Sequence, residues 1–380
     1  MGGPDCPGKE EYDKHLASGR FLVCFLVFSA ALRTCTIATT EDRISACQMK
    51  ILIWKIGALG DVVMTTPLIR QLRLTNPDAQ IDYLVGQSSA LILRGNPYLS
   101  NLITFDEAIL VRRQFLRLGK LLDAMRGYDV LLILDKHWIF GLLGWLSRTP
   151  KRIGFMRTRI EGGLHTKRVP YGELRHEIHY YLLLGKALTE SVDLTDTALE
   201  LPPATPHPIE RPYTVLINSG GENFREHSAV RRMPHKLFSE LSRHCASHTK
   251  VVYVGSQAER SAYEAFSYPT TVNLCGELTL QEVWSVLKNA EAIFCTDSGL
   301  MHMAAAVNPC VTAIFGPTHP ARKCPPGARW VWADSDIYDS RYELFGKIPS
   351  SDFFSSLEVN SIINASSTAW FPPGSVAQEK

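Results

Sequence analysis

Two short turns in the sequence carry side chains suited to binding an anion and accepting a proton. The first, Thr296-Asp297-Ser298-Gly299, follows the apolar run 293–295 and precedes the small residues 304–306. A turn from a strand into a helix directs backbone N–H groups outward, where the helix dipole favours negative charge. Open α/β sheets bind ligands at such strand ends. The turn therefore predicts an anion site, although Asp297 or Ser298 would also serve as a simple helix cap.

The second turn, Gly57-Ala58-Leu59-Gly60-Asp61, follows the apolar run 51–56. Its two glycines permit a tight turn and close approach of a ligand to the backbone. The spacing is not G-x-G-x-x-G, so the dinucleotide fingerprint is absent and a nicotinamide oxidoreductase is disfavoured. The place of Asp61 stays open. Either it caps the next helix, or Thr66 does so with Pro67 in the first helical position, which leaves Asp61 on a free loop.

Alternating strands and helices position these turns. Such alternation predicts parallel sheets covered on both faces. The predicted strands are 51–56, 80–85, 102–105, 130–134, 152–155, 213–218, 250–254, 272–274, 292–295 and 310–315. The predicted helices lie near 107–126, 138–147, 174–189, 234–246, 279–289 and after Gly299, with a further helix carrying Glu259.

The length of 380 residues favours two domains, and segment 202–208 holds four prolines, which exclude helix and central strand. We therefore predict an N-terminal α/β domain over 49–201, a hinge over 202–212, a C-terminal α/β domain over 213–345 and a tail over 346–380. Residues 1–48 form an extension outside the fold. Its apolar run 21–32 resembles a weak signal peptide or short anchor, but we favour translation beginning at Met49.

Composition excludes several classes of protein. A net charge of +2 predicts no strong attraction to nucleic acid. The nine cysteines include no C-x-x-C pair and no zinc spacing, so we expect mostly buried thiols in a reducing, cytoplasmic setting. No apolar run is long enough for an ordinary membrane span. Asp334-Ser335-Asp336 resembles a D-x-D metal motif but follows the core sheet in a polar stretch, so we expect no metal there.

Segment 148–175 is strongly basic, and Gly162-Gly163 in its middle predicts a mobile loop. It is either a solvated surface loop or a surface for an anionic partner, such as a phosphorylated or carboxylated sugar or a lipid headgroup. Its cations are Arg148, Lys151, Arg152, Arg157, Arg159, Lys167, Arg168 and Arg175, opposed by Glu161 and Glu173.

Considered together, the two turns resemble the signatures of glycosyltransferase family 9, the ADP-heptose:lipopolysaccharide heptosyltransferases. Segment 50–67, with its strand, G-x-x-G-D and T-T-P, resembles the family's N-terminal signature. Segment 296–320, T-D-S-G-L-M-H-M-A-A-A followed by F-G-P-T-H-P, resembles the second signature. The similarity extends from about residue 49 to about residue 345.

The resemblance implies a GT-B fold, in which two Rossmann-like domains face each other across a cleft. The N-terminal domain would bind an anionic glycolipid acceptor, and the C-terminal domain would bind the nucleotide sugar. The reaction would be inverting, metal-independent and free of cofactors, with Asp61 as the general base. The implied substrate-binding residues are Gly60, Gly220, Arg231, Glu259, Thr296, Asp297, Ser298, Gly299 and His302.

The phosphate-binding position departs from the family pattern. There the basic residue is usually Lys followed by an aromatic, whereas this chain has Arg231, Arg232 and Met233 after a long loop from Gly220. Arg225 and Arg232 therefore remain alternatives to Arg231 as the phosphate ligand. Arg231 resembles a residue that holds the phosphates, and Glu259 one that binds the nucleotide's ribose.

We expect a glycosyltransferase that moves a heptose, or a related sugar, from an ADP-sugar to a lipopolysaccharide core-type acceptor. A positioned base contributes about 10²–10⁴-fold to such a reaction, and donors aimed at the departing diphosphate often contribute more. Peripheral contact with the inner membrane leaflet is an open option. The alternatives are a GT-B sugar-nucleotide epimerase, which needs no separate acceptor, and a non-catalytic sugar-nucleotide-binding protein.

Overall fold

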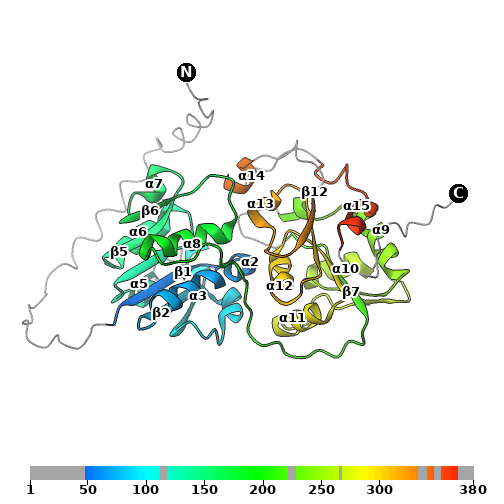
Figure 1. The fold of residues 1–380 in the computed structure, drawn as a ribbon, viewed down its shortest axis with the longest axis horizontal. Helices are drawn as coiled ribbons and strands as arrows, with labels where there is room; N and C mark the ends of the chain where they lie inside the picture. The colour runs from blue at the N-terminus through cyan, green and yellow to red at the C-terminus, as the bar shows by residue number, and fades with distance from the viewer. Residues whose placement is uncertain are drawn as a thin grey trace, which may run out of the picture. The chain divides into compact units, whose positions relative to one another are not determined.

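The apolar runs of the sequence form two six-stranded parallel sheets, one in each half of the chain (Figure 1). The computed structural model describes residues 48–111, 118–220, 228–264, 268–332, 340–345 and 352–366. We call the elements from β1 to α8 the N-half and those from β7 to α15 the C-half. Both belong to one compact unit that begins at Gln48.

The N-half sheet has the strand order β3-β2-β1-β4-β5-β6. The order reverses between β1 and β4, which is the place where doubly wound sheets bind ligands. The strands are β1 (Lys50–Lys55), β2 (Gln80–Gly86), β3 (Asn101–Phe105), β4 (Val130–Ile133), β5 (Lys151–Met156) and β6 (Lys167–Pro170). The helices are α2 (Leu59–Val63), α3 (Thr66–Thr75), η2 (Gln87–Leu93), α4 (Ala108–Val111), α5 (Leu118–Ala124), α6 (Trp138–Leu146), α7 (Arg159–Gly162) and α8 (Glu177–Leu188).

The C-half repeats this plan with the order β12-β11-β10-β7-β8-β9, so its reversal lies between β7 and β10. The strands are β7 (Tyr213–Ile217), β8 (Lys250–Tyr253), β9 (Thr271–Asn273), β10 (Ala292–Thr296), β11 (Val311–Phe315) and β12 (Arg329–Trp332). The helices are η4 (Ser228–Arg231), α9 (His235–Ala246), α10 (Gln257–Glu264), α11 (Leu280–Asn289), α12 (Gly299–Val307), α13 (Pro320–Lys323), α14 (Ser340–Phe345) and α15 (Val359–Ala365).

Strand β1 shows why the central strands are continuous apolar runs. Its side chains alternate between the two faces of the sheet. Ile51 and Ile53 join the core cluster that contains Leu68 of α3, whereas Trp54 packs in a second cluster with Phe140 of α6. Both faces are therefore buried under helices, as the sequence predicted. Each predicted strand is present, with ends that differ by one residue.

The edge strands β6 and β12 were not predicted, and β6 changes the interpretation of the basic segment. Besides β5, which matches the predicted strand 152–155, residues 148–175 contain the short helix α7, which includes Gly162, and β6, where a mobile loop was predicted around Gly162-Gly163. Edge strands are short and often charged or proline-containing, which hides them from a search for apolar runs. The Lys-Arg-Val-Pro sequence of β6 is of this kind.

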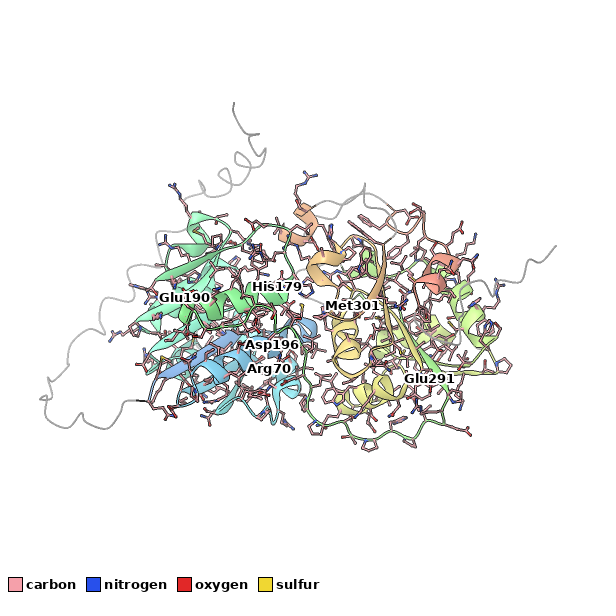
Figure 2. All side chains as sticks on the ribbon, in the orientation of Figure 1. Arg70, His179, Glu190, Asp196, Glu291 and Met301 are labelled. Atoms are coloured by element: carbon pink, nitrogen blue, oxygen red, sulfur yellow. The ribbon has the colours of Figure 1, made fainter. Side chains whose placement is uncertain are left out.

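The end of the N-half is held to α3 before the proline-rich segment begins. Arg70 forms ion pairs with Asp196 and Glu200, and the Arg70–Asp196 pair can be followed in Figure 2. Gln71 Nε2 donates to Asp196 Oδ2 over 2.7 Å. Residues 201–210 have no regular secondary structure, as predicted for the proline-rich segment.

The predicted tail over 346–380 is partly a structural element. Its described part, 352–366, contains α15 and contributes Phe353, Phe354 and Ile362 to the apolar cluster around Phe294 of β10. This contribution was not predicted from the sequence, because serines alternate with the apolar residues of this segment and no apolar run is visible.

Several predictions fall on parts of the chain that lie outside the described residues. These are the N-terminal extension as far as residue 47, Arg225, and the D-x-D pair Asp334 and Asp336. Among the residues that the structure describes, no helix combines the length and apolar character needed to cross a membrane.

Candidate active site

The two glycine turns meet at the ends of the two sheets. A Cβ atom added to Gly60 would lie 2.7 Å from His302 Cδ2 and 3.1 Å from Gly299 Cα. One added to Gly299 would lie 3.2 Å from the backbone nitrogen of Gly60. The glycines therefore allow α2 of the N-half to contact the start of α12 in the C-half. The sequence predicts close approach of a ligand to the backbone of the first turn, and this stays a prediction; what the structure shows is that the lack of a side chain at Gly60 permits close contact with Gly299 and His302.

Asp61 lies in the first turn of α2, so neither predicted arrangement of this segment is correct. Helix α2 ends at Val63 and α3 begins at Thr66, with Thr65 at the N-cap and Pro67 in the first turn. The carboxylate keeps 27% of its side-chain exposure. It is therefore fixed by the helix backbone yet still within reach of a substrate.

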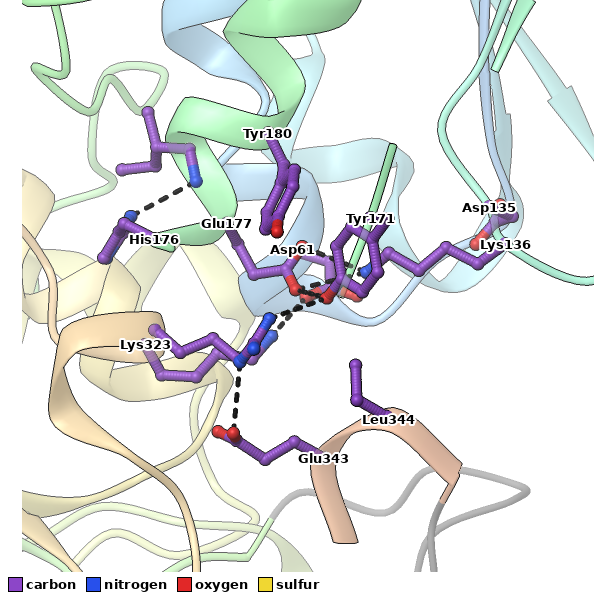
Figure 3. Close-up of polar contacts among 12 residues, drawn as sticks. Asp61, Asp135, Lys136, Tyr171, His176, Glu177, Tyr180, Lys323, Glu343 and Leu344 are labelled. Atoms are coloured by element: carbon purple, nitrogen blue, oxygen red, sulfur yellow. Dashed lines mark hydrogen bonds and ion pairs between the residues drawn. The ribbon is translucent and has the colours of Figure 1, made fainter. Parts of the chain in front are cut away.

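Two lysines, one from each half, form ion pairs with Asp61, and Figure 3 shows Lys323 beside Asp61. Lys55 Nζ, at the end of β1, lies 3.4 Å from Asp61 Oδ2. Lys323 Nζ, at the end of α13, lies 3.3 Å from Asp61 Oδ1. Lys55 is in turn fixed by Asp135, which follows β4, at 2.6 Å. The site thus occupies the β1–β4 reversal of the N-half, where the fold favours ligand binding.

The charges around Asp61 keep it ionised. Burial by itself would raise the pKa of the Asp61 carboxyl, but Lys323, then Lys55 and Lys136, outweigh burial and hold that pKa well below its usual range. Against the opposing effect of burial, Asp135 and then Asp61 raise the pKa of Lys55, while Asp61 and then Glu177 raise the pKa of Lys323. At neutral pH the cluster is therefore made of charged, mutually stabilised groups.

A second carboxylate, Glu177 at the start of α8, lies in the same cluster and was missed in the sequence. Lys136 Nζ is 3.0 Å from Glu177 Oε2, and the Tyr171 hydroxyl donates to Glu177 Oε1. Burial raises the pKa of Glu177, but Lys136 and Lys323 outweigh this and lower it to about 2. Figure 3 shows these side chains pointing toward Asp61.

Helix α13 of the C-half is docked into the N-half by three consecutive residues. Besides Lys323, Arg322 Nη2 donates to the Glu173 carbonyl over 2.9 Å, while its Nε pairs with Glu343 over 3.1 Å. The next residue, Cys324, presents its carbonyl 2.8 Å from His176 Nε2. These contacts fix the position of α13 against the N-half and so place the Lys323 ammonium beside the Asp61 carboxylate.

In the C-half, Asp297 follows β10 and is buried. Its Oδ2 accepts a 2.6 Å hydrogen bond from Thr318 and lies 3.6 Å from Arg231 Nη1. Arg231 Nε also donates to the Tyr342 hydroxyl over 2.9 Å. Thr296 Oγ donates to the Ser219 carbonyl over 2.7 Å, which fixes the end of β10 beside the segment that follows β7 and contains Gly220.

Two buried polar atoms in the first turn of α12 and at its N-cap have no hydrogen-bond partner among the described residues. Within the described part of the chain, Ser298 Oγ and His302 Nδ1 are buried and form no hydrogen bond. Burial lowers the pKa of His302 to about 3, so its ring is neutral at neutral pH. Since buried polar atoms are rarely left unsatisfied, these two atoms suit a ligand with hydrogen-bonding groups.

Glu259 occupies a separate position on α10. Its Oε2 accepts from the Ser256 backbone N–H over 2.7 Å, and Oε1 lies 3.7 Å from Arg232 Nη2. The Oε1 atom itself makes no hydrogen bond among the described residues, which leaves it available to a hydroxyl group. Arg232 therefore pairs with Glu259, whereas Arg231 points toward Asp297, which distinguishes two of the three candidate phosphate ligands.

The contact between the turns leads to a first prediction. We expect Gly60→Ala to lower the turnover number at least tenfold, because the new methyl group would displace His302 or separate α2 from α12. Gly119→Ala is the matched control, since a Cβ there meets nothing within 4 Å. Steady-state kinetics of both variants test this. Equal activity in the two would show that the Gly60–Gly299 contact is unimportant to the working enzyme.

A second prediction concerns the phosphate ligand. We expect Arg231→Ala to weaken binding of a nucleoside diphosphate by about 1.5–3 kcal/mol, the usual value for a charged hydrogen bond. Isothermal titration calorimetry with ADP measures the effect. If Arg231→Ala is silent and Arg225→Ala is not, the assignment of Arg231 is wrong.

Fold and site together define a class: a two-domain α/β protein in which the ends of the two sheets bring a carboxylate close to the start of a helix. Residues 115–340, more than half of the chain, match the model of glycosyltransferase family 9 (heptosyltransferase). The chain belongs to this glycosyltransferase family.

Individual relatives agree with the family assignment. Lipopolysaccharide heptosyltransferase 2 of Escherichia coli K12 is 27% identical over 293 residues, which cover 72% of this chain and 84% of the relative. The solved E. coli ADP-heptose lps heptosyltransferase II is 21% identical with a TM-score of 0.64, over 83% of this chain and 97% of that one. E. coli heptosyltransferase WaaC, solved with ADP-2-deoxy-2-fluoro heptose, is 18% identical with a TM-score of 0.63, over 83% and 98%. These structures share the GT-B fold with this chain.

Proposed function

We propose that the protein transfers a heptose from an ADP-activated donor to a lipopolysaccharide core-type acceptor, with inversion and without a metal ion. The observation that carries the proposal is the contact of Gly60 with Gly299 and His302, which brings the Asp61 carboxylate to the start of α12. The names of the E. coli relatives, including a structure with an ADP-heptose analogue, support the choice of donor and acceptor.

In the proposed reaction the donor lies against the C-half. The diphosphate would accept hydrogen bonds from Ser298 Oγ and the first N–H groups of α12, and Arg231 would neutralise part of its charge. Helix starts favour anions, and α12 is long enough to contribute a dipole. Glu259, through its unbonded Oε1, would accept from a ribose hydroxyl.

The acceptor would approach from the N-half. Its hydroxyl oxygen attacks the anomeric carbon on the face opposite the diphosphate, and Asp61 accepts the hydroxyl proton as the new bond forms. The bond from the anomeric carbon to the phosphate oxygen breaks, and ADP leaves with the electron pair. Attack from the opposite face inverts the anomeric configuration.

An assay for nucleoside diphosphate release tests the proposal. The full chain is incubated with ADP-heptose, ADP-glucose and a UDP-sugar, each with and without a lipopolysaccharide core acceptor. We expect ADP release that requires both ADP-heptose and the acceptor. Equal release without an acceptor, or isomerisation of the donor instead of transfer, would contradict the proposal and favour an epimerase.

A third prediction addresses the role of metals. We expect transfer to continue in excess EDTA, because Arg231 and Lys323 supply the positive charge that a metal would otherwise bring to the diphosphate. The measurement is the transfer rate with EDTA, and with EDTA followed by Mg²⁺ or Mn²⁺. Loss of activity that either ion restores would contradict the prediction and make Asp334 and Asp336 the candidate metal ligands.

A further inference from the structure

Helix α6 exposes two tryptophans on one face. Its sequence, Trp-Ile-Phe-Gly-Leu-Leu-Gly-Trp-Leu, contains no charged residue. Phe140 and Leu143 are buried against the sheet, whereas Trp138 and Trp145 are exposed, Trp145 by 52%. Trp138, Gly141 and Trp145 follow helical spacing and form one stripe. Exposing the large apolar surface of tryptophan to water is unfavourable, and contiguous exposed apolar surfaces often mark sites of interaction.

Helix α7 and the residues after it extend this apolar stripe. A Cβ on Gly141, in the middle of the stripe, would lie 3.5 Å from the Glu161 carbonyl and 3.6 Å from Leu164 Cβ. Leu164 is itself exposed, and Ile160 of α7 is exposed by 57%. Four large apolar side chains thus lie on α6, on α7 and in the turn that follows α7, and the two helices contact each other.

Exposed arginines border the apolar side chains. Arg148 follows α6, and Arg159 begins α7. Arg168 of β6 pairs in register with Gly154, and a Cβ on Gly154 would touch His165, which also lies beside Gly141. Because paired residues of parallel strands point to the same face, Arg168 faces the α6–α7 side, and its Nη2 lies 3.4 Å from the Gly163 carbonyl.

The basic segment therefore does not form one surface. Lys167 is paired with Ile153, whose side chain belongs to the cluster on the opposite face of the sheet. Arg157 pairs with Glu161 and donates to the Leu344 carbonyl, so it is engaged within the fold. Three exposed arginines remain on the α6–α7 side; Arg152 lies on this side too, but its guanidinium donates to the backbone carbonyls of Leu164 and Thr149. The acidic residue of α7 is buried and already paired.

We propose that this face, made of Trp138, Trp145, Ile160 and Leu164 with Arg148, Arg159 and Arg168, binds the surface of an anionic lipid bilayer. Tryptophans prefer the headgroup region, where the ring is buried and the indole N–H stays hydrated. Arginines beside them attract anionic headgroups. Neither feature alone distinguishes a bilayer from a protein partner, but the two together match the charge and polarity profile of an anionic interface.

The position of the face also suits a membrane-bound acceptor. One residue separates the start of helix α6 from Asp135 and Lys136, which contact Lys55 and Glu177 in the candidate site. Attachment through α6 would thus hold the site close to the headgroups. This part of the argument rests on the proposed function, whereas binding to a bilayer without acceptor does not.

Vesicle sedimentation tests the proposal independently of activity. The full chain is mixed with vesicles of phosphatidylcholine, or of phosphatidylcholine with phosphatidylglycerol, without glycolipid or nucleotide. We expect binding only to the anionic vesicles. Arg148→Gln, Arg159→Gln and Arg168→Gln combined should lower the partition coefficient on the order of 100-fold, given the usual contribution of each cation near such a surface. Trp145→Ser should lower it roughly tenfold and reduce quenching of tryptophan fluorescence by brominated lipid.

Matched controls come from the C-half. Lys236, Arg243 and Lys288 are exposed and can be changed to Gln together, and Trp330, exposed by 52%, can be changed to Ser. We expect these variants to bind vesicles like the unchanged protein. An equal loss of vesicle binding in control and test variants would show that binding depends on the net charge of the protein and not on this face, and would overturn the proposal. Unchanged binding in the test variants would place attachment elsewhere, for example in the apolar run 21–32, and would overturn the proposal. Binding that requires the glycolipid would identify the face as an acceptor site instead.

Discussion

Replacing Asp61 with alanine is expected to lower the transfer rate by about 10²–10⁴-fold, the usual contribution of a positioned base. Asp61 is the partly exposed carboxylate on α2, and α2 contacts the start of α12 through Gly60. Donor affinity should stay nearly intact, because Asp61 lies on the N-half, and removing an anion does not weaken binding of a diphosphate. The measurements are the single-turnover rate and the Kd for ADP.

Asp61→Asn is the companion variant. It keeps the size of the side chain but replaces one carboxylate oxygen with an NH2 donor, so it can accept a hydrogen bond from only one of Lys55 and Lys323 and cannot act as a base. Similar rate loss in both variants would assign the effect to the missing base. If ADP binding falls as much as the rate, Asp61 acts mainly in holding the two halves together, and the assignment as base is wrong. Thermal unfolding of both variants controls for misfolding.

Much of the fold could be predicted because each central strand is buried on both faces. The apolar runs of β1, β4, β7 and β10 are therefore visible without any tertiary information. The edge strands β6 and β12 were not predicted, because most of their residues are not buried and charged residues stand among their apolar ones. The basic segment was misinterpreted for the same reason: charge was visible in the sequence, but the register that divides it between two faces was not.

The candidate site was predicted in part. Two motifs at strand ends contained Gly60, Asp61, Asp297, Ser298 and Gly299, and the structure brings these residues together. Their roles in binding and catalysis stay predictions. Lys136 follows β4 at the sheet's reversal point, so the rule that placed Asp61 could also have found it.

Other members of the cluster had weaker signals. Lys323 lies just beyond the Gly316–Pro320 motif, and only the fold brings it across to Asp61. Glu177 begins a helix and resembled an ordinary helix-start acid in the sequence. Long-range ion pairs of this kind have no local pattern, because their members are fixed by the packing of separate elements.

Replacing Lys323 with methionine is expected to change both the rate and its pH dependence. Lys323 is the main cause of the low pKa of Asp61, against the opposing effect of burial, with Lys55 contributing less. Asp61 must be ionised to accept a proton, so kcat/KM falls at acid pH as this carboxyl becomes protonated. Without Lys323 the pKa of Asp61 rises toward its ordinary value. The acid limb of the profile should therefore move to higher pH.

The rate at neutral pH should fall as well, by about 10²–10³-fold, if the Lys323 ammonium also stabilises the charge of the departing diphosphate. Lys323→Arg keeps the positive charge and should leave the acid limb near its original pH. The measurement is kcat/KM for the donor between about pH 3 and pH 8, a range that extends below the ordinary Asp pKa of about 3.9. A uniform loss in both variants, with the acid limb unmoved, would mean that Lys323 fixes the position of α13 and does not control the ionisation of Asp61.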